Sequence, residues 1–178
     1  MSKGNSGHFE GTSGEKRHQE ELEKAFPERR DITCKFQESK EDLIREVKRR
    51  GEKITPEEVI AIFRDGSGRI VWLEVGQVRN EMRRGAGLRH ILDRHFGEFE
   101  KKGLAVESIV ELIVSTVRSQ KPVGTAKTSN PLPSTVYKAE YNGKRFYLAV
   151  SVGSNGFIVG ANPIAAKKIL FNNKKGES

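Results

Sequence analysis

The spacing of apolar residues changes near residue 118, and no other feature of this 178-residue chain limits its fold so strongly. Before that point lies the longest amphipathic pattern, Val106 to Val117, in which apolar residues recur every three or four positions, the period of a helix. After residue 134 apolar and polar side chains alternate from Val136 to Tyr141, which is typical of a strand. A helical part followed by strands predicts an α+β domain.

Two turns divide the C-terminal strands. Asn142-Gly143 separates two strand-like runs, and this dipeptide in such a place is a strong signal for a tight hairpin. Gly153 to Gly156 predicts a second turn before a third strand, Phe157 to Ala161, which we expect to end at Asn162-Pro163. The strands therefore form an antiparallel meander, and residues 118–134 before them are expected to be a long loop.

Capping signals mark the first helices. Ser39 stands three residues before Asp42, a capping box that predicts a helix closed by Gly51. A later helix is predicted over residues 88–96, where Leu88, Ile91 and Leu92 follow glycines.

The segment after Thr55 leaves two possibilities. A hydroxyl followed by Pro56 and two glutamates predicts a brief helix through Val59–Phe63. Alternatively, Val59–Phe63 is a strand that forms a hairpin with the β-branched and aromatic run Ile70–Leu73.

Composition sets the expected boundaries. Residues 1–17 are rich in Gly and Ser and are expected to be a flexible linker, a tether to a larger delivery protein. Residues 18–53 are expected to be an N-terminal helical segment, with a short helix ending near Pro27. Residues 54–172 form the main domain, and residues 173–178 are a polar tail.

Charge and apolar content exclude several classes. Lys and Arg number 32 against 24 Asp and Glu, a formal charge of +8, so polyanions are the leading partner class and acidic proteins the second. The longest unbroken apolar run, Val59–Phe63, is far shorter than the roughly 20 residues of a membrane helix, so we expect no membrane-spanning segment. The single cysteine, Cys34, excludes an internal disulfide framework and a zinc site of several thiolates.

Two of the four histidines lie in the helix predicted after Gly87. At about 100° per residue, His90 and His95 lie about 140° apart around the axis, whereas His90 and Arg94 share a face. Either His90 and Arg94 point into one site while His95 supports the fold, or the helix ends near Arg94 and His95 turns back. Because imidazole transfers protons near neutral pH, His90 is the candidate base and His95 a candidate acid.

Other chemistries find less support. A metal site at His95 and Glu98 lacks a third ligand, and nothing around Cys34 indicates an activated thiol. Gly66-Ser67-Gly68 precedes a strand-like run instead of opening a helix, so we expect no nucleotide cofactor.

A basic protein with one or two histidines and no metal suits cleavage of RNA by its own 2′-hydroxyl, which leaves a 2′,3′-cyclic phosphate. Arg94 would bind the phosphate oxygens through its planar fork. Further donors would come from the sheet and the loop before it: Thr125, Lys127, Thr128, Ser129, Tyr147, Ser151 and Asn162. Of these, Thr128 and Asn162 are the catalytic candidates. The residues expected to bind RNA are Lys127, Lys144, Arg145, Tyr147, Arg83 and Arg84.

Three segments resemble one group of toxins: ITPEEVIAIFRDGSGRIVWLE, GAGLRHILDRHFGEF and NGKRFYLAVSVGSNGFIVGANP. They are similar to C-terminal toxin domains of bacterial polymorphic and contact-dependent inhibition toxins and of phage proteins, grouped with barnase, EndoU, colicin and RelE-type ribonucleases. The resemblance covers about residues 54–170, and "HI, two residues, RH" at positions 90–95 is its most telling part. It implies a metal-independent ribonuclease, helices packed on a four-stranded antiparallel sheet, and a tight cognate immunity protein.

The resemblance also bears on the site. Its matching positions are His90, Arg94 and His95. Many relatives carry Thr or Ser on the final strand, where this chain reads Val159-Gly160-Ala161-Asn162, so Asn162 is the substitute.

Two alternatives remain open: a basic nucleic-acid- or protein-binding module with structural histidines, and a transferase acting on a cofactor such as NAD, which no motif supports. Under the toxin hypothesis the protein is delivered from a producing bacterium and acts in the target-cell cytoplasm on RNA, with tRNA among the targets. Its immunity protein would be acidic, because the domain is basic.

Overall fold

The computed structural model describes residues 38–79, 84–127 and 132–172. In this part of the chain the helices are α2 (Lys40–Arg49), α3 (Leu88–Glu100) and α4 (Val106–Ser119), with 3-10 turns at Pro56–Glu58 and Ala166–Lys168. The strands are β1 (Val59–Arg64), β2 (Ile70–Glu74), β3 (Gln77–Arg79), β4 (Arg84–Ala86), β5 (Gly124–Ala126), β6 (Thr135–Tyr141), β7 (Lys144–Val152), β8 (Ile158–Ile164) and β9 (Ile169–Phe171).

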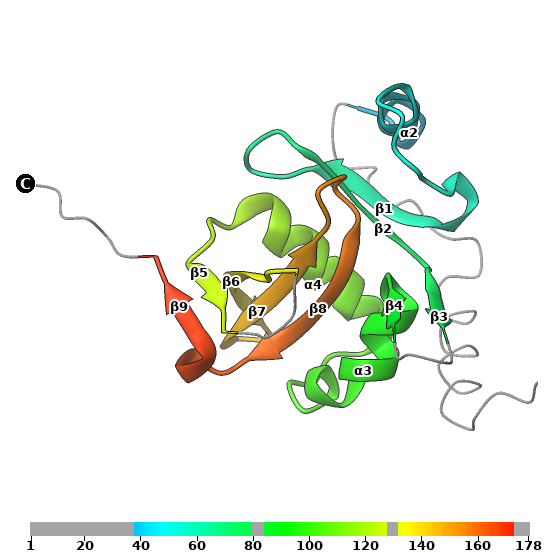
Figure 1. Ribbon diagram of the computed structural model, residues 1–178. Helices are drawn as coiled ribbons and strands as arrows, with labels where there is room; N and C mark the ends of the chain where they lie inside the picture. The colour runs from blue at the N-terminus through cyan, green and yellow to red at the C-terminus, as the bar shows by residue number, and fades with distance from the viewer. Residues whose placement is uncertain (1–37, 80–83, 128–131, 173–178) are drawn as a thin grey trace, which may run out of the picture.

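The strands form three antiparallel sheets. Two are the hairpins β1-β2 and β3-β4, and the third has five strands in the order β8-β7-β6-β5-β9. The α+β class predicted from the sequence is confirmed (Figure 1). None of the described helices has the length and apolar character needed to cross a membrane. The predicted linker 1–17, the short helix near Phe26 and the tail 173–178 lie outside the described residues.

The segment after Thr55 forms the hairpin and not the helix. Helical structure stops after one 3-10 turn, and β1 then pairs with β2 in a register that sets Ile62 opposite Trp72. The run is apolar at every position because both faces of the hairpin are covered. Val59, Ile62 and Trp72 pack with α2, and Ile60 packs into the main core with α4.

The predicted start of α2 is confirmed. The Ser39 hydroxyl oxygen accepts a hydrogen bond from the backbone N–H of Asp42 at 3.1 Å, and Gly51 adopts a φ of 76° after the last turn. The predicted hairpin is confirmed as well. Asn142 and Gly143 both have positive φ, 47° and 73°, as the tightest hairpin turns require.

The five-stranded sheet extends beyond the sequence prediction. The third strand of the meander continues through Pro163, which lies opposite Leu148, so the expected end at Asn162-Pro163 is wrong. A proline is tolerated there because β8 is an edge strand. The expected loop over residues 118–134 contains β5, and a fifth strand, β9, follows at residues 169–171.

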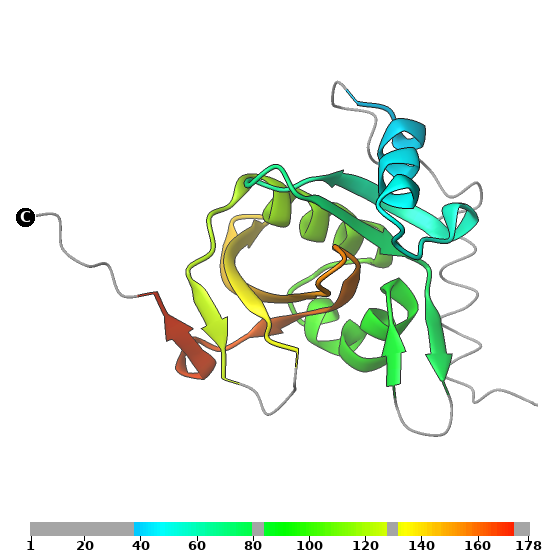
Figure 2. The ribbon, with the colours of Figure 1, turned by 45° about the horizontal axis from the view of Figure 1, so that its top comes forward.

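The sheet is strongly curled. β8 and β9 lie at opposite edges, yet only residues 165–168 join them. From Ile164 to Ile169 a fully extended chain spans at most about 18 Å, and the 3-10 turn over Ala166–Lys168 shortens this connection. A flat five-stranded sheet would be about 19 Å wide, so the edges approach each other at this end. The curvature is visible in Figure 2. It encloses a small second core in which Val136, Ala149 and Ile169 are buried.

The two faces of the sheet differ. Leu148, Val150 and Ala161 belong to the main core beneath α3 and α4. Because side chains alternate along a strand, Ser151 and Gly160 lie on the opposite face, paired with each other across β7 and β8.

Candidate active site

The N-terminus of α3 abuts the edge of the sheet. The backbone N–H of Gly87 donates to the carbonyl oxygen of Val159 in β8 at 3.2 Å. Gly87 has a φ of 83°, and a Cβ there would lie 2.7 Å from the Glu74 carbonyl oxygen, so only glycine fits this approach. The first turn of α3 is therefore fixed against β8.

His90 projects from that first turn onto β8. A Cβ built at Gly160 would lie 3.8 Å from Cδ2 of His90, so the imidazole packs against the bare backbone. Gly160 is paired with Ser151, whose hydroxyl oxygen lies 2.6 Å from the hydroxyl oxygen of Ser134. Directly paired residues of an antiparallel sheet have Cα atoms about 4.5–5.5 Å apart, so a half-buried imidazole and two hydroxyls share one small region.

Electrostatics keeps His90 neutral. Burial lowers the pKa of His90, and the positive charges of His95 and Arg94 lower it further, while Asp93 opposes them. A histidine with a lowered pKa is unprotonated at neutral pH. It is then able to accept a proton.

Arg94 and His95, the other two candidate residues of α3, have surroundings different from those of His90. α3 continues without interruption to Glu100, so the alternative in which the helix ends near Arg94 and His95 turns back is wrong. The Nδ1 atom of His95 lies 3.4 Å from the Glu98 carboxylate, one turn further on. Arg94 is exposed one turn after His90, on the same face of the helix.

Of the two residues predicted as catalytic hydrogen-bond donors, only Asn162 lies in the part of the chain that the structure describes. Asn162 lies two residues after Gly160 on the same face of β8, but its amide nitrogen donates to the Pro163 carbonyl oxygen at 3.0 Å. Thr128 lies outside the described residues. Ser134 is not among the donors predicted from the sequence. The hairpin turn at Asn142-Gly143 could have indicated it, because the strand register that pairs Tyr141 with Lys144 also sets residue 134 opposite Ser151.

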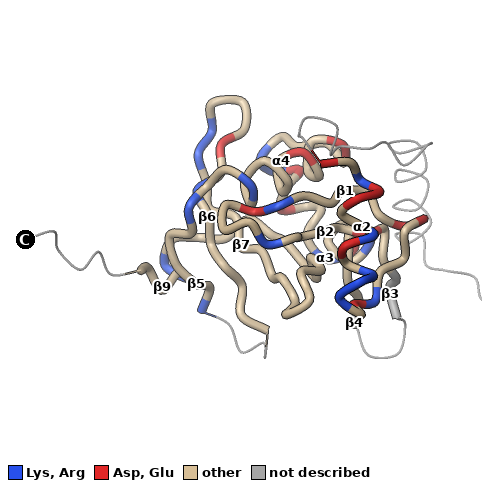
Figure 3. Tube along the Cα trace, turned by 90° about the horizontal axis from the view of Figure 1, so that it is seen from above, with Lys and Arg blue, Asp and Glu red and all other residues tan. Residues whose placement is uncertain are grey.

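The residues expected to bind RNA lie mostly away from His90. Lys144 and Arg145 begin β7 at the hairpin, where Arg145 pairs with Glu140 at 2.9 Å. Lys127 follows β5, and its ammonium donates to the Lys167 carbonyl oxygen at 3.3 Å. Arg84 opens β4, and Arg83 lies outside the described residues. Figure 3 shows basic positions spread over several elements rather than gathered in one patch.

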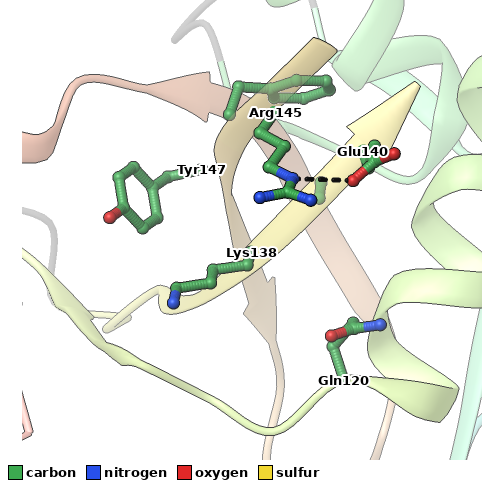
Figure 4. A pocket seen from close by; sticks show the side chains of 7 residues that line it. Gln120, Lys138, Glu140, Arg145 and Tyr147 are labelled. Carbon is green, nitrogen blue, oxygen red and sulfur yellow. Dashed lines mark hydrogen bonds and ion pairs between the residues drawn. The ribbon is translucent and has the colours of Figure 1, made fainter. Parts of the chain in front are cut away.

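A pocket of about 400 Å³ lies at the hairpin end of β6 and β7. Figure 4 shows the side chains that line it. They are Gln120, Lys138, Ala139, Glu140, Arg145, Phe146 and Tyr147. The structure thus groups Arg145 with Tyr147, and it sets both apart from His90.

Within the described residues, no three His, Cys, Asp or Glu side chains gather closely enough to hold a metal ion. No known family model matches the chain, and no curated protein matches it significantly in sequence.

Proposed function

We propose that this protein is an endoribonuclease that cleaves RNA without a metal, by attack of a 2′-hydroxyl on the adjacent phosphate. The observation that carries the proposal is the setting of His90. A half-buried imidazole with a lowered pKa packs on Gly160 of the edge strand, and Ser151, directly opposite that glycine, is hydrogen-bonded to Ser134. This combination supplies a base together with donors for a phosphate oxygen.

The proposed reaction assigns one role to each group. Neutral His90 takes the proton of the 2′-hydroxyl as the bond from that oxygen to phosphorus forms. Arg94, on the same helix face, binds the phosphate oxygens, and Asn162 donates a further hydrogen bond. The bond to the 5′-oxygen then breaks, leaving a 2′,3′-cyclic phosphate and a 5′-hydroxyl.

The leaving oxygen needs a proton. Because α3 is unbroken, His95 projects from a different side of the helix than His90. We therefore propose the Ser151 hydroxyl, hydrogen-bonded to Ser134, as the donor in place of His95. It passes its proton to the 5′-oxygen and takes from His90 the proton that the imidazole accepted from the 2′-hydroxyl. In this scheme His95 takes no direct part in the proton transfers, and a positive charge on it would lower the pKa of His90.

The biological role proposed with this activity is that of a toxin. Its supports are the resemblance of residues 54–170 to bacterial and phage toxin domains and the formal charge of +8. Such a domain would be delivered from a producing bacterium and would act on RNA, tRNA among the candidates, in the cytoplasm of a target cell. An acidic immunity protein would bind it rapidly through electrostatic steering.

Incubation of purified protein with total RNA, with and without EDTA, tests the activity. We expect cleavage that survives EDTA and ends that carry a 2′,3′-cyclic phosphate. His90→Ala is expected to lower the rate by roughly 10²–10⁴-fold, the usual contribution of a general base. His95→Ala is the matched control on the same helix and should lose much less. Full cleavage by a folded His90→Ala protein, or RNA binding without any product, would reject the proposal.

A further inference from the structure

The pocket at the hairpin end of β6 and β7 has a lining unlike the site around His90. Lys138 and Tyr147 are paired across the two strands, and Arg145 and Glu140 are the next pair on the same face. Gln120, at the C-terminal end of α4, adds an amide from the side (Figure 4). Two aromatic residues, two cations, a carboxylate and an amide therefore line one cavity of about 400 Å³.

Exposed apolar side chains lie beside this pocket. The ring of Tyr147 contacts the ring of Phe171 edge to face, with centroids 5.8 Å apart. Phe171 is 50% exposed and Leu170 is 56% exposed, and in the described part of the chain they are the large apolar side chains most open to solvent. Together with the ring of Tyr147 they form a contiguous exposed apolar surface next to the charged groups of the pocket, and such a surface rimmed by polar groups is typical of a binding site.

The charges of the pocket are available to an anion. Arg145 is 85% exposed, and its ion pair with Glu140 therefore contributes little to stability. Lys138 makes no ion pair with any described residue. A phosphate group could replace the carboxylate of Glu140 as the partner of Arg145, with Lys138 close by on the neighbouring strand.

The pocket and the candidate site at His90 lie beside the same strand, β7, at different points along it. Tyr147 and Ser151 lie on the same face of β7, four residues apart, which is about 13 Å along a strand. Ser151 is opposite Gly160, on which the imidazole packs. Ala149, between them on this face, is buried in the small second core, so an RNA strand would have to pass around that core. A strand of several nucleotides bound with one phosphate at His90 is long enough to do so and reach Tyr147.

We infer that this pocket, together with Phe171, binds unpaired nucleotides of a single RNA strand that flank the cleaved phosphate. The inference rests on the proposed function. Bases that are free of a duplex stack on aromatic rings, and Tyr147 and Phe171 offer two, while Lys138 and Arg145 offer charge to the connecting phosphates. A duplex would leave the rings unused, because its bases are already stacked on each other.

Binding is measured with the His90→Ala protein, so that no substrate is cut, and a fluorescent 12-nucleotide single strand of mixed sequence. Tyr147→Leu is expected to weaken binding by about five- to hundredfold, the range for loss of one stacked base. Tyr147→Phe keeps the ring and should bind as before. Lys48→Gln, an exposed charge on α2, is the matched control for Lys138→Gln and should change binding less. An RNA duplex of the same length should be insensitive to Tyr147→Leu.

Cleavage adds a second readout. With the 12-mer, Tyr147→Leu in the otherwise unchanged protein should raise KM and leave kcat near its original value, and with a dinucleotide it should change neither. Unchanged single-strand binding in a folded Tyr147→Leu protein, or an equal loss for the duplex, would overturn the inference. Tyr147-dependent binding by a protein that cuts no RNA would refute the ribonuclease proposal alone.

Discussion

The contact between His90 and Gly160 gives the most direct test of the candidate site. A Cβ at residue 160 would lie 3.8 Å from the imidazole, an ordinary van der Waals separation, so Gly160→Ala should leave the ring in place. Gly160→Val adds two methyl groups about 1.5 Å beyond that Cβ, which shortens the separation to as little as about 2.3 Å. The ring must then move by about 1 Å to restore contact at roughly 3.5 Å. A displacement of that size can lower the rate by about 10²-fold.

The assay is kcat/KM for cleavage of one RNA oligonucleotide by the wild type and both variants. Neither substitution changes a titratable group, and both residues suit an edge strand better than glycine, so both proteins should fold, which thermal denaturation would check. We expect Gly160→Ala to stay close to the wild type and Gly160→Val to fall by about 10²-fold. Wild-type activity in Gly160→Val would show that the imidazole beside Gly160 takes no part in the reaction.

Three further predictions concern pH and stability. Because burial lowers the pKa of His90, kcat/KM should stay constant down to a pH below 6.5, the ordinary pKa of histidine, and an acid limb centred above pH 6.5 would contradict this. The free energy of unfolding should fall as the pH drops below 6.5, because the unfolded chain binds the proton of His90 more tightly than the folded chain does. Burial raises the pKa of Glu74, because the charged carboxylate is costly there. Glu74→Gln removes that charge and keeps an oxygen for the Trp72 indole N–H, which lies at 3.1 Å, so the variant should be at least as stable to urea as the wild type at pH 7. Any gain should disappear near pH 4, where the Glu74 carboxyl of the wild type is neutral as well. Gly156→Ala should cost at least about 2 kcal/mol in the same assay, because its Cβ would lie 2.3 Å from a backbone oxygen and 2.9 Å from the Trp72 ring at a φ of +109°; a loss below 0.5 kcal/mol, the range of ordinary surface changes, would contradict it.

The features that the sequence predicts well are those set by a few neighbouring residues. The hydroxyl cap at Ser39 and the two positive φ angles at Asn142-Gly143 depend only on local backbone geometry, and both occur as expected. The long helix α4 follows from its apolar stripe, because seven of its apolar residues are buried in the main core. Each of these signals is complete within a single turn or a single helix of the chain.

The features that the sequence could not predict depend on closure of the sheet. β5 and β9 have three residues each, too few to show a period, and they pair with each other only because the sheet curls. Val59–Phe63 reads equally well as a buried helix or a buried strand, and the choice depends on α2 and α4 covering both faces. The candidate base His90 follows from residue type, whereas its neighbours Ser151 and Ser134 follow only from strand register.

Strand register also explains how the proposed site could hold a hydroxyl that its edge strand lacks. The strand β8, against which His90 packs, has neither Ser nor Thr. The residue directly opposite Gly160 is Ser151, on the neighbouring strand. Gly160 has no side chain to stand between the imidazole and its partner on β7. In the proposed site, therefore, the hydroxyl comes from β7, and a glycine on the edge strand leaves room for it beside His90.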